Sequence, residues 1–157
     1  MILVLSIYLA ALGCWLGGIV FFSFFTAPAV FTRLPTAEAG HLISAIFPRY
    51  YMLGYVAGTV SLILAVYLTA VRGPRIWWGA TTVALAIALG LTFYAGTVIL
   101  PRADAIRTVV EEPNPDPARK AEFDRLHGMS VMINGAVLLL NLAAVVGTSG
   151  EIGRAHV

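Results

Sequence analysis

One stripe of polar side chains carries most of the chemistry of this otherwise apolar chain. Its members are His127, Ser130, Asn134 and Asn141, at successive spacings of three, four and seven residues. Such spacings place side chains on one face of an α-helix. Within a membrane, amides and hydroxyls either hydrogen-bond a neighbouring helix or line a polar cavity, and the stripe fits both interpretations. It is therefore a candidate ligand-binding site, with helix–helix contact as the alternative.

Metal or haem chemistry has a small set of candidate ligands. They are Cys14, His41, Met52, His127, Met129 and Met132. Soft thiolate and thioether ligands suit Cu(I), and a bis-histidine haem would have to join His41 to His127. However, His127 and Met129 fall on different faces of a helix, and no His-x-x-x-His or Cys-x-x-Cys pair occurs. We expect no metal site and no cofactor, with a haem- or copper-binding oxidoreductase as the alternative.

Other function classes leave no pattern in the sequence. There is no Ser/His/Asp arrangement, no pair of carboxylates at one site and no phosphate-binding loop, so no catalytic residue is assigned. The net charge is only +2, and the basic residues are scattered between apolar stretches, which argues against a nucleic-acid partner. The single cysteine excludes an internal disulfide.

Composition identifies the class of protein. Hydrophobic residues make up 59% of the chain and charged residues only 11%, against roughly 25% charged in a soluble domain. Four uncharged stretches each exceed the ~20 residues that cross ~30 Å of hydrocarbon as a helix. The sequence therefore predicts an all-α bundle of four transmembrane helices, at about residues 2–31, 50–71, 76–100 and 128–148, within one membrane domain over residues 1–150.

The connections refine this topology. Residues 36–47 lie between two prolines with their apolar side chains on one face, which predicts an interfacial amphipathic helix between spans one and two. Residues 72–75 form a tight turn. Asp116 followed by Pro117 is a typical helix start. That helix is expected to continue into span four, so spans three and four form an extended extramembrane hairpin.

Small residues indicate where the helices approach one another. The glycines in GxxxG spacing are Gly13 and Gly17 in span one, and Gly54 and Gly58 in span two. Close backbone approach at such residues drives helix association in lipid. The same faces allow a homo-oligomer, or a structural subunit of a larger complex. Trp15 and Asn141 lie at similar depths, so we also expect an indole-to-amide hydrogen bond between them.

Basic residues are concentrated at one end of the spans. The first and third connections hold seven Lys and Arg residues and the second holds two, which favours both chain ends outside. Arg33, Arg49 and Arg102 all fall at the more basic end. They are candidates for binding a lipid phosphate or another anion. The alternative is that they anchor helix ends at the interface.

The last seven residues, 151–157, have a different origin in our interpretation. Their sequence, EIGRAHV, corresponds to the in-frame translation of a common short-read sequencing adapter. We therefore exclude them from the reasoning about fold and site.

Three motifs resemble the transmembrane protein 205-like family, which in bacteria forms domain of unknown function 4149. They are WLGGIVFFSFFTAPAVF at 15–31, AGHLI at 39–43 followed by FPRYY at 47–51 and Gly54, and FDRLHGMSVMIN at 123–134. The matching motif residues are Gly17, Gly18, Pro28, Phe31, Arg49, Tyr50, Tyr51, His127, Ser130 and Asn134. The resemblance implies a four-pass protein of the bacterial inner (plasma) membrane. Eukaryotic members are linked with resistance to platinum drugs.

These observations lead to one functional expectation. The chain is expected to bind, or help to move, a small solute, a metal complex or a lipid. The ends of spans one and three and the starts of spans two and four would form its site, and membrane lipid is its expected partner.

The charge distribution yields a test of orientation. In a Gly73→Cys variant we expect the new thiol to react with an impermeant maleimide only from outside the cell. Reaction only from the cytoplasmic side would reverse the assignment.

Overall fold

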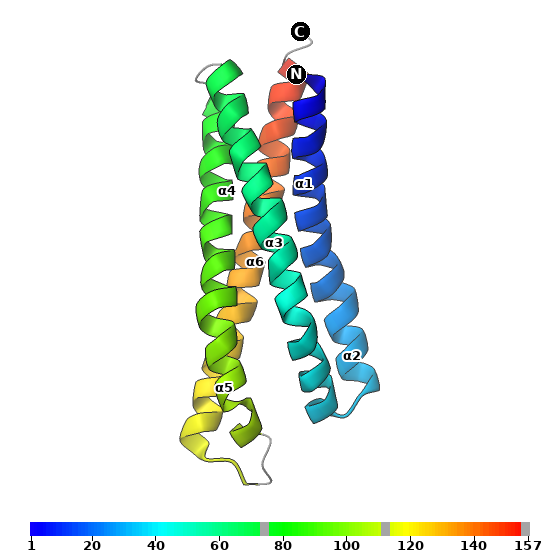
Figure 1. The fold of residues 1–157 in the computed structure, drawn as a ribbon, viewed down its shortest axis with the longest axis vertical. Helices are drawn as coiled ribbons and strands as arrows, with labels where there is room; N and C mark the ends of the chain where they lie inside the picture. Colours follow the sequence, from blue (N-terminus) through cyan, green and yellow to red (C-terminus); the bar gives the residue numbers. More distant parts are fainter. Residues whose placement is uncertain (73–75, 111–113, 155–157) are drawn as a thin grey trace.

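The structure, a computed structural model, describes residues 1–72, 76–110 and 114–154. These residues form two long helical hairpins (Figure 1). The first consists of α1 (Ile2–Phe21), η1 (Phe22–Thr26), α2 (Ala27–Arg33) and α3 (Thr36–Arg72). The second consists of α4 (Ile76–Tyr94), η2 (Ala95–Ile99), α5 (Leu100–Val110) and α6 (Pro117–Arg154). Of the adapter-like tail, residues 155–157 lie outside the described residues.

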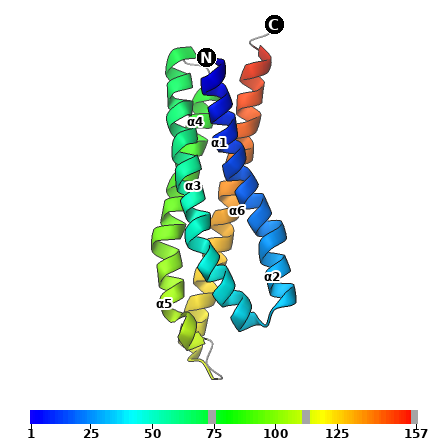
Figure 2. The same cartoon turned by 45° about the vertical axis from the view of Figure 1, so that its right-hand side comes forward.

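The predicted all-α bundle with four spans is confirmed. Four helical segments are long and apolar enough to cross a membrane: Ile2–Arg33, Thr36–Val71, Ile76–Thr108 and Pro117–Gly150. Both hairpins begin and end at the same end of the bundle, so they run parallel to each other (Figure 2). Helix α2, helix α5 and the start of α6 lie at the opposite end (Figure 1).

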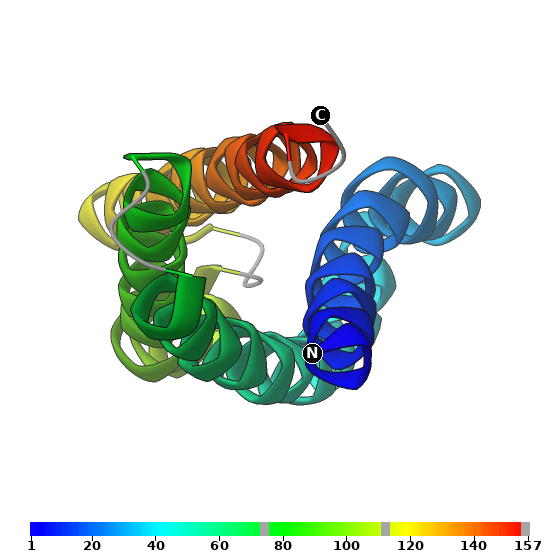
Figure 3. The ribbon, with the colours of Figure 1, turned by 90° about the horizontal axis from the view of Figure 1, so that it is seen from above.

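The four long helices surround a common axis in the order α1, α3, α4, α6 (Figure 3). The packing is extensive between α1 and α3, between α3 and α4, and between α4 and α6. The remaining neighbours, α1 and α6, share the fewest contacts. One side of the bundle is therefore packed less extensively than the other three.

Each hairpin contains a π-helical turn two residues before a proline. In η1 the amide of Ala27 bonds to the carbonyl of Phe22, and in η2 the amide of Leu100 bonds to the carbonyl of Ala95. Pro28 and Pro101 follow these turns. A proline cannot donate to the carbonyl four residues earlier, and its ring crowds that turn. The wider π turn relieves this conflict without ending the helix.

The structure corrects the separate interfacial helix predicted for residues 36–47. These residues are helical, but they form the first part of α3, which runs without a break through Pro48. Ala39 and Ile43 are buried, and Ser44 donates a hydrogen bond to Asp104 of α5. Part of the apolar face that indicated membrane binding therefore packs inside the protein, although Leu42 on that face is exposed.

The hairpin predicted between spans three and four is confirmed. The Asp116 carboxylate accepts a hydrogen bond from the amide of Ala118 at 3.1 Å, which caps the start of α6. From Pro117 the helix continues without interruption into span four. The start of α6 packs on the second hairpin's other arm through buried Ile99, Ile106 and Leu126.

Glycines produce close packing on the α3–α4 side. A Cβ on Gly54 would lie 3.0 Å from Thr92, and one on Gly58 would lie 2.9 Å from Leu89 and from the ring of Trp15. On the other helix, a Cβ on Gly96 would lie 2.8 Å from the ring of Tyr51. Side chains at these positions would force α3 and α4 apart.

Gly13 and Gly17 do not pack against another helix within the described part of this chain. Both are exposed, and a Cβ at either position would meet nothing within 4 Å. Span one packs instead through large residues on a different face, namely Tyr8, Leu12, Trp15 and Ile19. GxxxG spacing alone cannot show which face of a helix meets a neighbour.

The close contact at Gly96 leads to a stability prediction. Gly96→Ala should destabilise the protein by about 1–3 kcal/mol, because the added methyl group would overlap the hydroxyl group of Tyr55 and the ring of Tyr51. Gly90→Ala is the control, since its Cβ would meet nothing within 4 Å. The control should be neutral or slightly stabilising, because alanine favours the helix. Thermal unfolding in detergent measures both, and equal effects would contradict the packing argument.

Candidate intramembrane binding site

Asn134 of α6 joins the two hairpins through its side-chain amide. Its Oδ1 accepts a hydrogen bond from the hydroxyl of Tyr50 in α3. Its Nδ2 donates to Ser23 Oγ in η1 at 2.8 Å. One amide therefore binds both helices of the first hairpin. In hydrocarbon such bonds matter because water is absent as an alternative partner.

Local features of the sequence bring these groups together. Ser23 lies within the π turn η1, where one extra residue in the turn shifts the helix face presented after it. Tyr50 comes two residues after Pro48 in α3. Asn134 lies near the middle of α6, on its inner stripe. Ser23 therefore lies in a helix irregularity that precedes a proline, whereas Tyr50 follows a proline within a continuous helix.

A pocket lies between all four long helices, with Asn134 in its wall. Its lining residues are Trp15, Gly18, Ile19, Tyr50, Tyr51, Leu53, Gly54, Thr92, Ala95, Ser130, Ile133, Asn134 and Val137. No Asp, Glu, Lys, Arg or His is among them. The cavity volume is about 20 Å³, which accommodates about one water molecule. The pocket is thus small, uncharged and partly polar.

Aromatic rings form one wall of the pocket and extend beyond it. The ring centroids of Phe22 and Tyr50 are 4.7 Å apart, and those of Tyr50 and Tyr51 are 5.3 Å apart. The series continues through Tyr55 to Phe93 of α4, whose rings stack at 4.3 Å. Tyr51 and Ser130 of α6 both line the pocket. These contacts hold the α3 wall in place, since stacked rings and their hydroxyl groups restrict one another.

The structure brings together only part of the residue set predicted from sequence. Ser130, Asn134, Tyr50 and Tyr51 line the pocket, together with Trp15 and Gly54, which were assigned to helix packing. His127 is exposed and is not among the lining residues. Of the stripe, only Ser130 and Asn134 line the pocket, and His127 and Asn141 do not.

The arginines do not contribute to the pocket. Arg33, Arg49 and Arg102 are all exposed, and none is among the lining residues. Arg49 donates to the carbonyl of Ala45, one turn earlier in its own helix, at 3.2 Å. The Arg49 side chain therefore contacts the backbone of its own helix.

The hydrogen bond expected between Trp15 and Asn141 is corrected. Asn141 is fully buried, and its Nδ2 donates to the carbonyl of Val137 at 2.9 Å. Its Oδ1 has no hydrogen-bond partner among the described residues. Trp15 instead packs its indole over Gly54 and Gly58 of α3. Trp15 and Asn141 therefore make their contacts with other residues.

Three contributors to the site were not assigned to ligand binding from the sequence, although Gly18 was among the family-motif residues. Ser23 carries one end of the hydrogen-bonded chain, and Thr92 and Gly18 line the pocket. A serine within an aromatic stretch just before a proline is a signal that would have pointed to Ser23. Thr92 bonds to the carbonyl of Ala88 in its own helix, so its type and position carry no comparable signal.

Candidate metal ligands are not gathered in the described part of the chain. Within residues 1–72, 76–110 and 114–154, no group of three or more His, Cys, Asp or Glu side chains is placed to hold a metal ion. Cys14 and His127 are both exposed.

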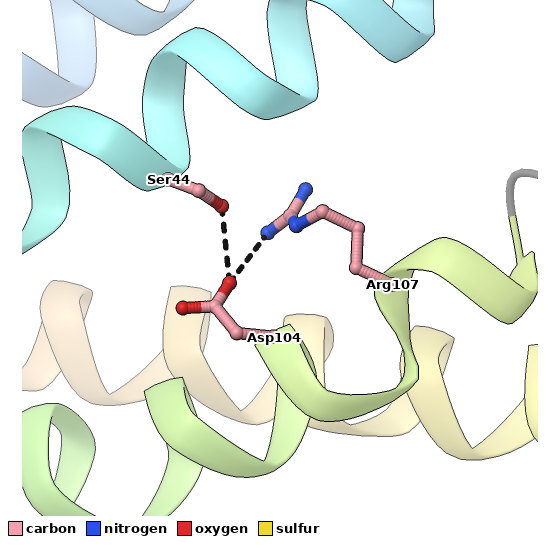
Figure 4. Close-up of polar contacts among 3 residues, drawn as sticks. All are labelled: Ser44, Asp104 and Arg107. Carbon is pink, nitrogen blue, oxygen red and sulfur yellow. Dashed lines mark hydrogen bonds and ion pairs between the residues drawn. The ribbon is translucent and has the colours of Figure 1, made fainter.

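A charged contact near the connecting turns links the two hairpins. Asp104 of α5 accepts hydrogen bonds from Ser44 of α3 at 3.1 Å and from Arg107 Nη2 at 3.3 Å (Figure 4). The guanidinium of Arg107 also lies over the ring of Phe123 in α6, 5.5 Å from its centroid. These contacts fix α3, α5 and α6 relative to one another at the end of the bundle where the hairpins turn.

This protein is an all-α bundle with four apolar spans around an uncharged, partly polar pocket. These features define an integral membrane protein. The chain belongs to the family described as domain of unknown function (DUF4149), which it matches over residues 10–112. This confirms the resemblance seen in the motifs. An uncharacterized protein of Aquifex aeolicus is 30% identical over 142 residues, covering 87% of this chain and 90% of that protein. No solved structure matches the chain.

The hydrogen-bonded chain through Asn134 leads to a double-mutant test. Tyr50→Phe should destabilise the protein by about 0.6–1.7 kcal/mol, the range for hydrogen bonds between membrane helices. The same change should have little effect in an Asn134→Ala background, because the partner is already gone. Tyr67→Phe, at an exposed position of the same helix, is the control. Additive effects of the two changes on thermal stability would contradict the coupling.

Proposed function

We propose that this protein binds a small, uncharged, hydrogen-bonding solute in the pocket at Asn134 and helps to move it across or within the membrane. The observation that carries the proposal is the hydrogen-bonded chain from Tyr50 through Asn134 to Ser23, in the wall of an intramembrane pocket. Helix contacts alone would need no cavity beside them. The family's bacterial members lead us to propose the bacterial inner membrane as its location.

The chemistry of the lining selects the class of solute. Hydroxyl, amide and indole groups can donate and accept hydrogen bonds, but none of the lining residues carries a formal charge. A charged group placed there would lose its hydration without gaining an opposite charge, which is costly within a membrane. An uncharged alcohol, amide, urea-like or carbonyl compound has no such cost. The lining therefore favours neutral solutes over free ions or charged metal complexes.

The size of the cavity implies that binding and movement are linked. The pocket holds about one water molecule, so a larger solute enters only when helices separate. Asn134 bonds to both helices of the first hairpin. A solute that hydrogen-bonds to this amide competes with those contacts. Binding of the solute would thus weaken the contacts that hold these helices together. A facilitator needs this link between solute binding and helix movement.

Native mass spectrometry of the purified protein tests the proposal. We expect a small uncharged molecule to co-purify with the wild-type protein. Its occupancy should fall about tenfold or more in Asn134→Ala, because two hydrogen-bonding groups are lost from the pocket wall. His127→Ala is the matched control on the same helix, since His127 is exposed and outside the pocket. Absence of any bound molecule from the wild type, or equal occupancy in Asn134→Ala, would refute the proposal.

A further inference from the structure

The two interfaces between the hairpins are closed by different kinds of contact. Between α3 and α4, glycines admit ring and methyl groups at van der Waals distance, and Tyr55 stacks on Phe93. Between α1 and α6 the contacts are fewest among the neighbouring long helices. The exposed glycines of α1, Gly13 and Gly17, contribute no close contact to that side. We call the contact of α1 and η1 with α6 the seam.

Two side-chain hydrogen bonds cross the seam at different depths. Tyr8 Oη lies 2.9 Å from Thr148 Oγ1 near the chain ends, and both residues are buried. Asn134 Nδ2 donates to Ser23 Oγ at 2.8 Å, fourteen residues earlier along α6. Fourteen residues correspond to about 21 Å of helix. The seam is thus closed by a polar contact at each of two levels.

Midway between these two hydrogen bonds, one buried polar atom of α6 has no hydrogen-bond partner among the described residues. Asn141 lies seven residues from each of the two seam residues of α6, Asn134 and Thr148, on the same face. Its side chain is fully buried, and its Oδ1 has no hydrogen-bond partner among the described residues. A buried amide oxygen without a partner costs about 1–3 kcal/mol. A ligand donor that reached this level would remove that cost.

We infer that the pocket takes a membrane-dissolved amphiphile with an uncharged hydrogen-bonding head, such as a long-chain alcohol, and that this ligand enters laterally through the α1–α6 seam. The inference rests on the proposed function. The cavity holds only about one water molecule, so some interface must open to admit a ligand. The seam is the interface with the fewest contacts, and the pocket is lined by residues of both its helices.

The route determines the chemistry of the ligand. Separation of α1 from α6 connects the pocket with the hydrocarbon around the spans rather than with water. A molecule arriving this way must already be dissolved in the membrane, and a charged head is expensive at that depth. A hydroxyl head can bond to Asn134 or Ser130 as it enters, and its apolar tail can remain in the seam. Competition for Asn134 then weakens the bond to Ser23 that closes the seam.

Tryptophan fluorescence quenching by bromine-labelled probes tests the inference. The protein is placed in phosphatidylcholine vesicles, and the probe is a long-chain alcohol carrying bromine near its head. We expect quenching that saturates, and we expect the saturating component to be absent in Trp15→Phe, since Trp15 lines the pocket. A long-chain trimethylammonium with the same label should give no saturating component. Bromoethanol, which lacks the tail, should also give none.

Stopped-flow measurement of the saturating component tests the route. Ser23→Ala and Thr148→Val each remove one hydrogen bond across the seam, so binding of the labelled alcohol should be about three- to tenfold faster. The control is Thr69→Val. Thr69 Oγ1 lies 3.1 Å from Thr82 Oγ1 across the α3–α4 interface, so this change removes a comparable hydroxyl contact on the opposite side. Its binding rate should equal that of the wild type.

The possible outcomes separate the two proposals. Saturating, Trp15-dependent binding at the same rate in all variants would overturn lateral access and leave the proposed function intact. Equal binding of the trimethylammonium or of bromoethanol would overturn the ligand class. If no labelled probe gives a saturating component, the inference fails. The proposed function then fails only if native mass spectrometry also finds no bound molecule.

Discussion

Every polar group within the hydrocarbon region must find its partner inside the protein, and the arrangement of this bundle depends on that constraint. Asn134 meets it by binding Ser23 of η1 and Tyr50 of α3 at once. Those two bonds set the positions of three helices at one depth and place the pocket beside them. Asn141 meets the constraint only in part, because its Oδ1 has no partner among the described residues. Both side-chain groups of Asn134 have hydrogen-bond partners on other helices, whereas Asn141 Oδ1 has none among the described residues. This difference is why we place the function on the α1–α6 side of the bundle.

The two hairpins follow the same plan but are joined differently on their two sides. Each has an apolar helix, a π turn two residues before a proline, a short helix and a long returning helix. On one side α3 and α4 meet through glycines and stacked rings, which pack closely and gain from dispersion. On the other side α1 and α6 rely on hydrogen bonds at two levels. A ligand can replace a hydrogen bond with one of its own, whereas it cannot replace close packing. The α1–α6 side is therefore suited to opening, and the α3–α4 side is suited to holding the hairpins together.

The errors of the sequence-based predictions share a physical cause. Residues 36–47 are amphipathic, but amphipathicity does not distinguish a membrane surface from a protein interior, and here part of the apolar face packs within the bundle. Gly13 and Gly17 have the spacing of a packing motif, yet Trp15 and its neighbours on another face make the contacts of α1. Trp15 and Asn141 lie at similar depths but make their contacts with other residues. In each case the pattern along one helix was correct and the choice of partner was not.

The sequence by itself determined the number of spans, the helix start at Pro117, the family and the polar stripe on α6. These follow from local quantities: the length of uncharged stretches, a capping residue before a proline, and the period of the helix. Only the tertiary structure decided that Asn134 bonds to Ser23 and Tyr50, that His127 and the arginines stay outside the pocket, and that α1 and α6 form the least packed side. Those features depend on how each helix is rotated about its axis relative to its neighbours. That rotation results from packing among all four spans at once, so it cannot be predicted from the sequence of any one span.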